Sequence, residues 1–76
     1  MKEILETVIK NLVANPDAIS VKEVEGEQTI IFEVRVEESD MGKVIGKEGR
    51  VAKAIRTIMK AVAAKEGKRV SVEFIG

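Results

Sequence analysis

Apolar residues recur along the chain with two spacings, one typical of helices and one typical of strands. Near the N-terminus they come as adjacent pairs repeated every four residues, which places them in one stripe of a helix: Ile4, Leu5, Val8, Ile9, Leu12 and Val13. We expect Asn15 and Pro16 to end this helix. Further along, apolar side chains occupy every second position, as in a half-buried strand: Ile30, Phe32, Val34 and Val36.

Shorter signals predict the elements around this strand. Ile19 and Val21 predict a preceding strand, and Gly26 predicts the turn that makes the two strands a hairpin. Ser39 or Asp40 can cap a short helix that runs through residue 45, because both side chains accept hydrogen bonds from free N–H groups.

The rest of the chain predicts a long helix over residues 50–65, ending near Gly67, and a last strand over residues 69–75. The order is therefore helix, strand, strand, helix, helix, strand, or αββααβ. A three-stranded sheet with the helices on one face buries all the apolar stripes together. The sequence thus predicts a two-layer α+β fold.

Length and composition limit how this fold is stabilised. With 76 residues we expect a single domain over positions 1–76, and a domain of this size is only marginally stable. The chain contains neither cysteine nor histidine, so neither a disulfide nor an ordinary zinc site can add stability. We expect no metal or other cofactor, and oligomerisation remains as a source of stability.

Composition also argues against an enzyme and against a membrane protein. Without histidine or cysteine, the serine hydroxyls of the chain have no evident base. Glu3 and Glu6 interrupt the apolar residues of the first segment, so this segment predicts neither a signal peptide nor a membrane span. We expect a cytoplasmic protein.

The formal net charge is zero, but the charges are unevenly distributed. Residues 1–40 contain four basic and ten acidic side chains, whereas residues 41–60 contain six basic side chains and one acidic one. The six basic residues are Lys43, Lys47, Arg50, Lys53, Arg56 and Lys60. Such a segment indicates either a localised polyanion site or a solvated helix face.

Two glycines three residues apart, Gly46 and Gly49, separate the two later predicted helices. Glycine tolerates a positive φ and leaves its amide uncovered, so a ligand can approach the backbone closely. The free N–H groups and the positive dipole end of the following helix favour anions, and Lys47 and Arg50 stand beside them. Taken alone, a Gly-x-x-Gly between two helices favours a tight turn that stops a helix. The residues around it favour a phosphate-binding loop instead.

Other nucleotide-binding and RNA-binding motifs do not fit. Three residues instead of four separate Gly42 from the Gly46-Lys47 pair, and Glu48 stands where a Walker A loop needs Ser or Thr. The only aromatic residues, Phe32 and Phe74, are expected to point inward from strands, so no RRM-type stacking platform is predicted.

The residues around the two glycines resemble the KH domain. The segment VIGKEGR (44–50) is similar to the VIGxxGxx signature, and a helix before the hairpin resembles the type II arrangement. With NPDAI (15–19) and SDMGKVIGKEGRVAKAIRT (39–57), essentially the whole chain resembles the KhpA family of small bacterial RNA-binding proteins with one KH domain. This resemblance implies a type II KH fold with a cleft for about four nucleotides of single-stranded RNA. It further implies an RNA chaperone or post-transcriptional regulator.

The resemblance also implies roles for individual residues. The loop would clamp the sugar-phosphate backbone of RNA through Gly46, Lys47, Glu48 and Gly49. Positive charge beside the clamp would come from Lys43, Arg50 and Lys53. An apolar floor under the bases would come from Val44, Ile45 and Val51, for which core packing is an equal alternative. The carboxylate of Glu48 departs from many KH loops and should weaken phosphate binding.

A protein-interaction module on the same fold is the alternative function. The long helix has an apolar arc of roughly 200°, wider than its large side chains require. Its margins offer two alanine-flanked positions for a homodimer interface: Ile58 with Ala54 and Ala61, or Met59 with Ala52 and Ala63. We favour Ile58, because the Met59 margin runs into Arg56 and Lys60. The resemblance implies self-association too, as well as pairing with a larger KH-containing protein of the Jag type and a link to cell shape and cell-wall growth.

Overall fold

The computed structural model describes residues 1–75, and its helices and strands follow the order αββααβ. The helices are α1 (Lys2–Lys10), α2 (Met41–Ile45) and α3 (Arg50–Lys65). The strands are β1 (Ser20–Glu25), β2 (Thr29–Arg35) and β3 (Arg69–Ile75). Short 3-10 turns lie at Pro16–Ala18, Glu38–Asp40 and Lys47–Gly49. The predicted α+β order is confirmed, and the bounds of α3 agree with the prediction.

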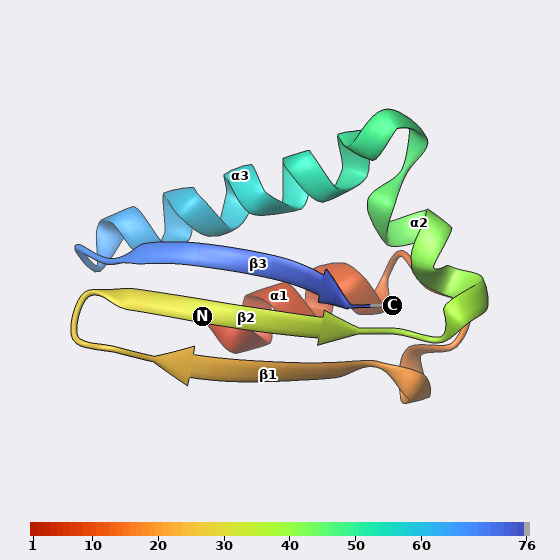
Figure 1. The fold of residues 1–76 in the computed structure, drawn as a ribbon, viewed down its shortest axis with the longest axis horizontal. Helices are drawn as coiled ribbons and strands as arrows, with labels where there is room; N and C mark the ends of the chain where they lie inside the picture. The colour runs from red at the N-terminus through yellow and green to blue at the C-terminus, as the bar shows by residue number, and fades with distance from the viewer. Residues whose placement is uncertain (76) are drawn as a thin grey trace.

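The strands form one mixed sheet in the order β1-β2-β3. The hairpin pairs β1 and β2 antiparallel, with Val21 opposite Val34, and β3 then pairs with β2 in parallel, with Val72 opposite Phe32. Helices α1 and α3 lie side by side on one face of this sheet, with α3 along the β3 edge (Figure 1). The two-layer arrangement expected from the apolar stripes is therefore present.

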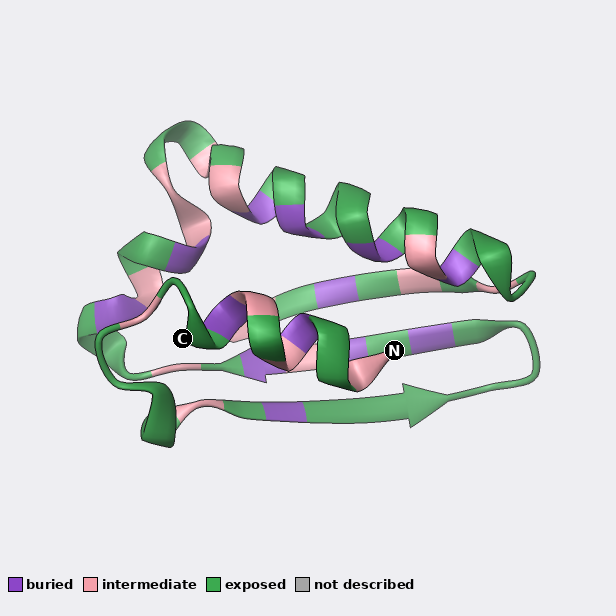
Figure 2. Ribbon diagram, turned by 180° about the vertical axis from the view of Figure 1, so that it is seen from behind, coloured by how far each residue is buried: buried purple, intermediate pink, exposed green. Residues whose placement is uncertain are grey.

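The core lies between the helices and the sheet. In Figure 2 the buried positions of α1 and α3 are on the sides that face the strands. The largest fully buried apolar side chains are Phe32, Leu5, Ile9, Met59, Val34 and Val44. Because β2 is the central strand, its alternate residues Ile30, Phe32 and Val34 contribute more to this core than the residues of either neighbouring strand.

The first helix is shorter than the apolar pattern predicts. It ends at Lys10 instead of continuing to Val13, and Leu12 is exposed. The Asn11 N–H still donates to the Thr7 carbonyl oxygen, but the Leu12 N–H donates to Ile9, three residues back, so the regular helical bonds end here. Beyond it, the amides of Ala14 and Asn15 donate to a carboxylate from a distant part of the chain.

That carboxylate belongs to Asp40, and it corrects the expected helix cap. Neither Ser39 nor Asp40 makes a side-chain cap bond to α2. The Asp40 side chain, only 1% exposed, instead turns toward the connection between α1 and β1. The start of α2 is thereby tied to the N-terminal half of the chain.

Candidate functional site

The loop between α2 and α3 has an unusual backbone. Gly46 ends α2 with φ +75° and ψ 176°, a region that is essentially restricted to glycine. Glu48 and Gly49 follow with φ +57° and +74°, both in the left-handed region. Three of the four loop residues therefore have positive φ. The loop, Gly46–Gly49, forms a tight turn before α3, which we call the arch.

The arch exposes backbone donors at the start of a long helix. The first residues of the 3-10 turn, Lys47 and Glu48, have N–H groups for which helical geometry provides no partner. Behind them begins α3, whose 16 residues are long enough to develop a positive dipole end at Arg50. Anions are favoured at this place even before side-chain charges are considered.

The basic residues predicted beside the arch differ in whether an acidic side chain pairs with them. The ammonium of Lys43 lies 3.3 Å from an Asp40 carboxylate oxygen, and the guanidinium of Arg50 lies 3.6 Å from the carboxylate of Glu48. Lys47 and Lys53 are exposed, and among residues 1–75 neither belongs to an ion pair. Glu48 thus neutralises part of the charge beside the loop, as expected for an acidic residue at this position.

Asp40 holds α2, and with it one side of the arch, in place. One carboxylate oxygen accepts from the Ala14 N–H at 3.0 Å, and the other accepts from the backbone N–H and the side-chain amide of Asn15 at 2.9 and 3.0 Å. Burial alone would raise the pKa of Asp40, but these hydrogen bonds and Lys43 outweigh it and lower the pKa from 3.8 to about 2. The carboxylate is therefore ionised at neutral pH.

The three apolar residues near the loop have different environments. Val44 is fully buried in the core, so it has no surface to offer a base and takes the packing role. Ile45 and Val51 are half-buried and pack against the edge of the core. These two keep an exposed portion beside the loop.

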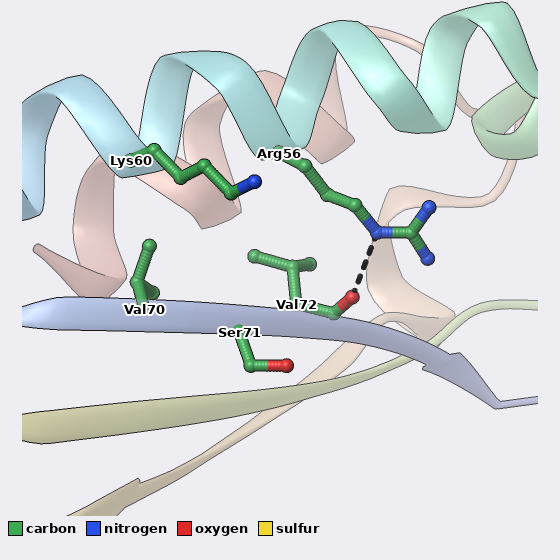
Figure 3. A pocket seen from close by; sticks show the side chains of 5 residues that line it. All are labelled: Arg56, Lys60, Val70, Ser71 and Val72. Atoms are coloured by element: carbon green, nitrogen blue, oxygen red, sulfur yellow. Dashed lines mark hydrogen bonds between the residues drawn. The ribbon is translucent and has the colours of Figure 1, made fainter.

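A groove that the sequence did not reveal lies between the middle of α3 and the outer edge of β3. Arg56 and Lys60 from α3 line it on one side, and Val70, Ser71 and Val72 line it on the other (Figure 3). Its cavity has a volume of about 280 Å³. Because β3 is an edge strand, alternate backbone groups face the groove, and the Val72 carbonyl accepts from Nε of Arg56 at 3.1 Å.

One signal for this groove is present in the sequence. Arg56 and Lys60 are four residues apart and so share a flank of α3. Only the tertiary structure shows that this flank borders β3. The arch and the start of α3 can hold phosphates, and the groove further along the same helix offers basic and apolar surface to a planar ring.

The opposite flank of α3 is open, and it contains the predicted dimer residues. Ile58 is 44% exposed, and Ala54 and Ala61 beside it are exposed as well. The competing flank is not available, because Met59, Ala52 and Ala63 are buried against the sheet. Of the two predicted interfaces, only the Ile58 flank is a surface.

No helix within residues 1–75 is long and apolar enough to cross a membrane.

Comparisons with known proteins agree with this architecture. The family model described as "KhpA/KhpB, KH domain" matches residues 2–74. A protein of Clostridium acetobutylicum named "RNA-binding protein KhpA" is 63% identical over 75 residues, which cover 99% of this chain and 100% of that protein. Proteins of the same name are 59% identical in Caldanaerobacter subterraneus, with 99% and 100% coverage, and 49% identical in Aquifex aeolicus, with 99% and 95% coverage.

The family description names a KH domain, and the relatives carry the name of an RNA-binding protein. The match spans α1, the hairpin, the glycine loop and nearly all of β3. The chain therefore belongs to the KhpA/KhpB family of KH domains.

Proposed function

We propose that this protein binds single-stranded RNA, with the phosphates on the Gly46–Gly49 arch and the bases in the groove between α3 and β3. The observation that carries the proposal is the positive-φ backbone of the arch at the start of α3, with a groove lined by Arg56 and Lys60 further along the same helix. Relatives at 49–63% identity bear the name RNA-binding protein, which supports the same conclusion.

Each candidate residue has a part in this proposal. Gly46, Lys47, Glu48 and Gly49 form the clamp, with Lys43, Arg50 and Lys53 as the charges beside it. Ile45 and Val51 border the bases, while Val44 supports them from the core. A duplex should bind less well, because its stacked bases cannot enter a groove that receives single rings.

Binding isotherms of single-stranded and duplex RNA at several salt concentrations test this proposal. Contacts to two to four phosphates of a single strand give a slope of log affinity against log salt of about −1.4 to −2.8. An affinity independent of salt, or tighter binding of duplex, would refute the clamp.

We further propose that two copies associate through the Ile58 flank of α3. The flank exposes a large apolar side chain between two alanines, so two helices can approach closely around it. Dimerisation would add buried area to a small fold. In the alternative function, a protein-interaction module, the same flank is the site we propose for docking to a larger KH-containing protein of the Jag type.

The finer roles remain predictions from the family resemblance. They are action as an RNA chaperone or post-transcriptional regulator, a cytoplasmic location, and a link to cell shape and cell-wall growth. Sequencing of RNA crosslinked to the protein, with a Lys47→Asp variant as control, would identify the transcripts concerned.

A further inference from the structure

Arg56 is held in place by two contacts with β3. Its Nε donates to the carbonyl oxygen of Val72 at 3.1 Å, and its guanidinium carbon lies 5.4 Å from the centre of the Phe74 ring. The hydrogen bond fixes the position of the group along β3, and the cation–π contact with the ring restrains the plane of the guanidinium. Arg56 is thus anchored at two points of the same strand.

This anchoring leaves one donor edge free. A guanidinium has five N–H donors, and the Val72 carbonyl uses only the one on Nε. Figure 3 shows both terminal nitrogens of Arg56 pointing away from that bond, on the side of the guanidinium opposite the rest of its side chain. The two terminal NH2 groups hold the four N–H donors that remain, and they form a planar fork whose direction is set before any ligand arrives.

Lys60, the other cation that lines the groove, has different chemistry. Its ammonium carries three donors on a flexible stem and contacts an acceptor as a point charge. Val70 and Val72 add apolar surface, and the cavity of about 280 Å³ is slightly smaller than the roughly 300 Å³ at which small-ligand pockets begin. A single planar ring suits this space better than a larger ligand.

We propose that Arg56 is a specificity-determining residue of the groove, selecting a nucleobase that presents two adjacent hydrogen-bond acceptors. This inference rests on the proposed binding of single-stranded RNA. Guanine presents O6 and N7 side by side, and cytosine presents O2 and N3. Adenine and uracil place a donor next to each acceptor on the corresponding edges, so they can satisfy only one arm of the fork.

The expected preference follows from the fork. A bidentate contact to a base discriminates by roughly 1–3 kcal/mol, which is about 5- to 150-fold in affinity. Preorganisation by Val72 and Phe74 reduces the entropy lost on binding. The lysine variant Arg56→Lys keeps the charge but has no fork, so it should keep most of the affinity and lose the preference.

Fluorescence anisotropy with uridine octamers, each carrying one central G, C, A or U, measures this directly. The wild type should bind the G or the C octamer at least about five-fold more tightly than the A and U octamers. Arg56→Lys should bind all four alike. Lys65→Gln is the control, because Lys65 is nine residues after Arg56 and so on the opposite side of the helix. This variant should keep the wild-type preference.

The outcomes separate this inference from the proposed function. Equal, salt-dependent binding of all four octamers by the wild type, or a preference that persists in Arg56→Lys, overturns the role of Arg56 and leaves RNA binding intact. Binding of none of them overturns RNA binding itself. A measurement on the wild type alone does not depend on the folding of a variant. Replacing the preferred base by 7-deazaguanine or 3-deazacytosine removes one acceptor and should abolish the higher affinity for that octamer. An unchanged affinity refutes the bidentate contact with Arg56.

Discussion

Val51 occupies the space that a side chain at Gly46 would need: a Cβ placed on Gly46 would lie 2.4 Å from Cγ2 of Val51 and 2.9 Å from its backbone nitrogen. The first turn of α3 therefore packs directly on the backbone of the arch. Gly49 differs, because a Cβ there would meet nothing within 4 Å. The two glycines of the motif are required for different reasons, a close approach at Gly46 and a left-handed backbone at Gly49.

This difference predicts unequal costs for two alanine substitutions. Gly49→Ala should reduce the free energy of unfolding by about 1–2 kcal/mol, the cost of a left-handed residue with a side chain. Gly46→Ala adds a steric clash to backbone strain and should cost about 3 kcal/mol or more. Urea denaturation of the two variants measures both values. Equal costs would show that the Val51 side chain shifts easily to make room. Adding Val51→Ala to Gly46→Ala should restore only part of the lost free energy of unfolding, because the backbone nitrogen of residue 51 stays in place.

The Asp40 carboxylate predicts a pH dependence of stability. Its pKa is lowered from 3.8 to about 2 in the folded state, so the ionised form stabilises the fold. That contribution is fully present above the unfolded pKa of 3.8 and is lost as the pH falls through about 2. The wild type should therefore melt at a higher temperature than Asp40→Asn at pH 7.

The gap between the two melting temperatures should narrow below about pH 4 and nearly close at pH 2. Comparing the two proteins at each pH cancels the other carboxylates, which both contain. A gap that stays constant down to pH 2 would mean that Asp40 acts by shape and not by charge.

The charges of the arch predict opposite changes in RNA affinity. Glu48→Lys removes a carboxylate that lies 3.6 Å from the Arg50 guanidinium and adds a cation, so RNA should bind more tightly. Lys47→Asp should weaken binding strongly, and Lys47→Asp with Glu48→Asp should abolish it. Because both side chains are exposed, circular dichroism should report an unchanged fold for each variant. Weaker binding by Glu48→Lys would show that this side chain does not approach phosphate.

The open flank of α3 predicts a dimer that one charge can disrupt. Sedimentation of the wild type should give a dimer, and Ile58→Asp should give a folded monomer, because its side chain is on the surface. Ile31→Asp is the matched control and should remain dimeric, because Ile31 is also an exposed isoleucine but alternates with the buried residues of β2 and so faces the side of the sheet opposite α3. A monomeric wild type refutes the dimer, and a dimeric Ile58→Asp moves the interface elsewhere. Met59→Asp is unsuitable as a test, since Met59 is fully buried and its replacement should unfold the protein.

The sequence by itself determined the order of the elements, the bounds of α3 and the family. Helix and strand periods are local properties, so α3 could be placed over residues 50–65 from its own residues. The Gly46–Gly49 spacing likewise indicated positive φ, because glycine is the residue that adopts it without strain.

Tertiary structure alone decided where α1 ends, which role Asp40 has and which flank of α3 is free. Asp40 bonds to Ala14 and Asn15 across about 25 positions of the chain, a contact that no local pattern encodes. Ile58 and Met59 are adjacent and equally apolar in sequence, yet only Met59 faces the sheet. The rotation of a helix about its axis depends on the surface it packs against, and for the same reason only the packed structure brings Arg56 to the edge of β3.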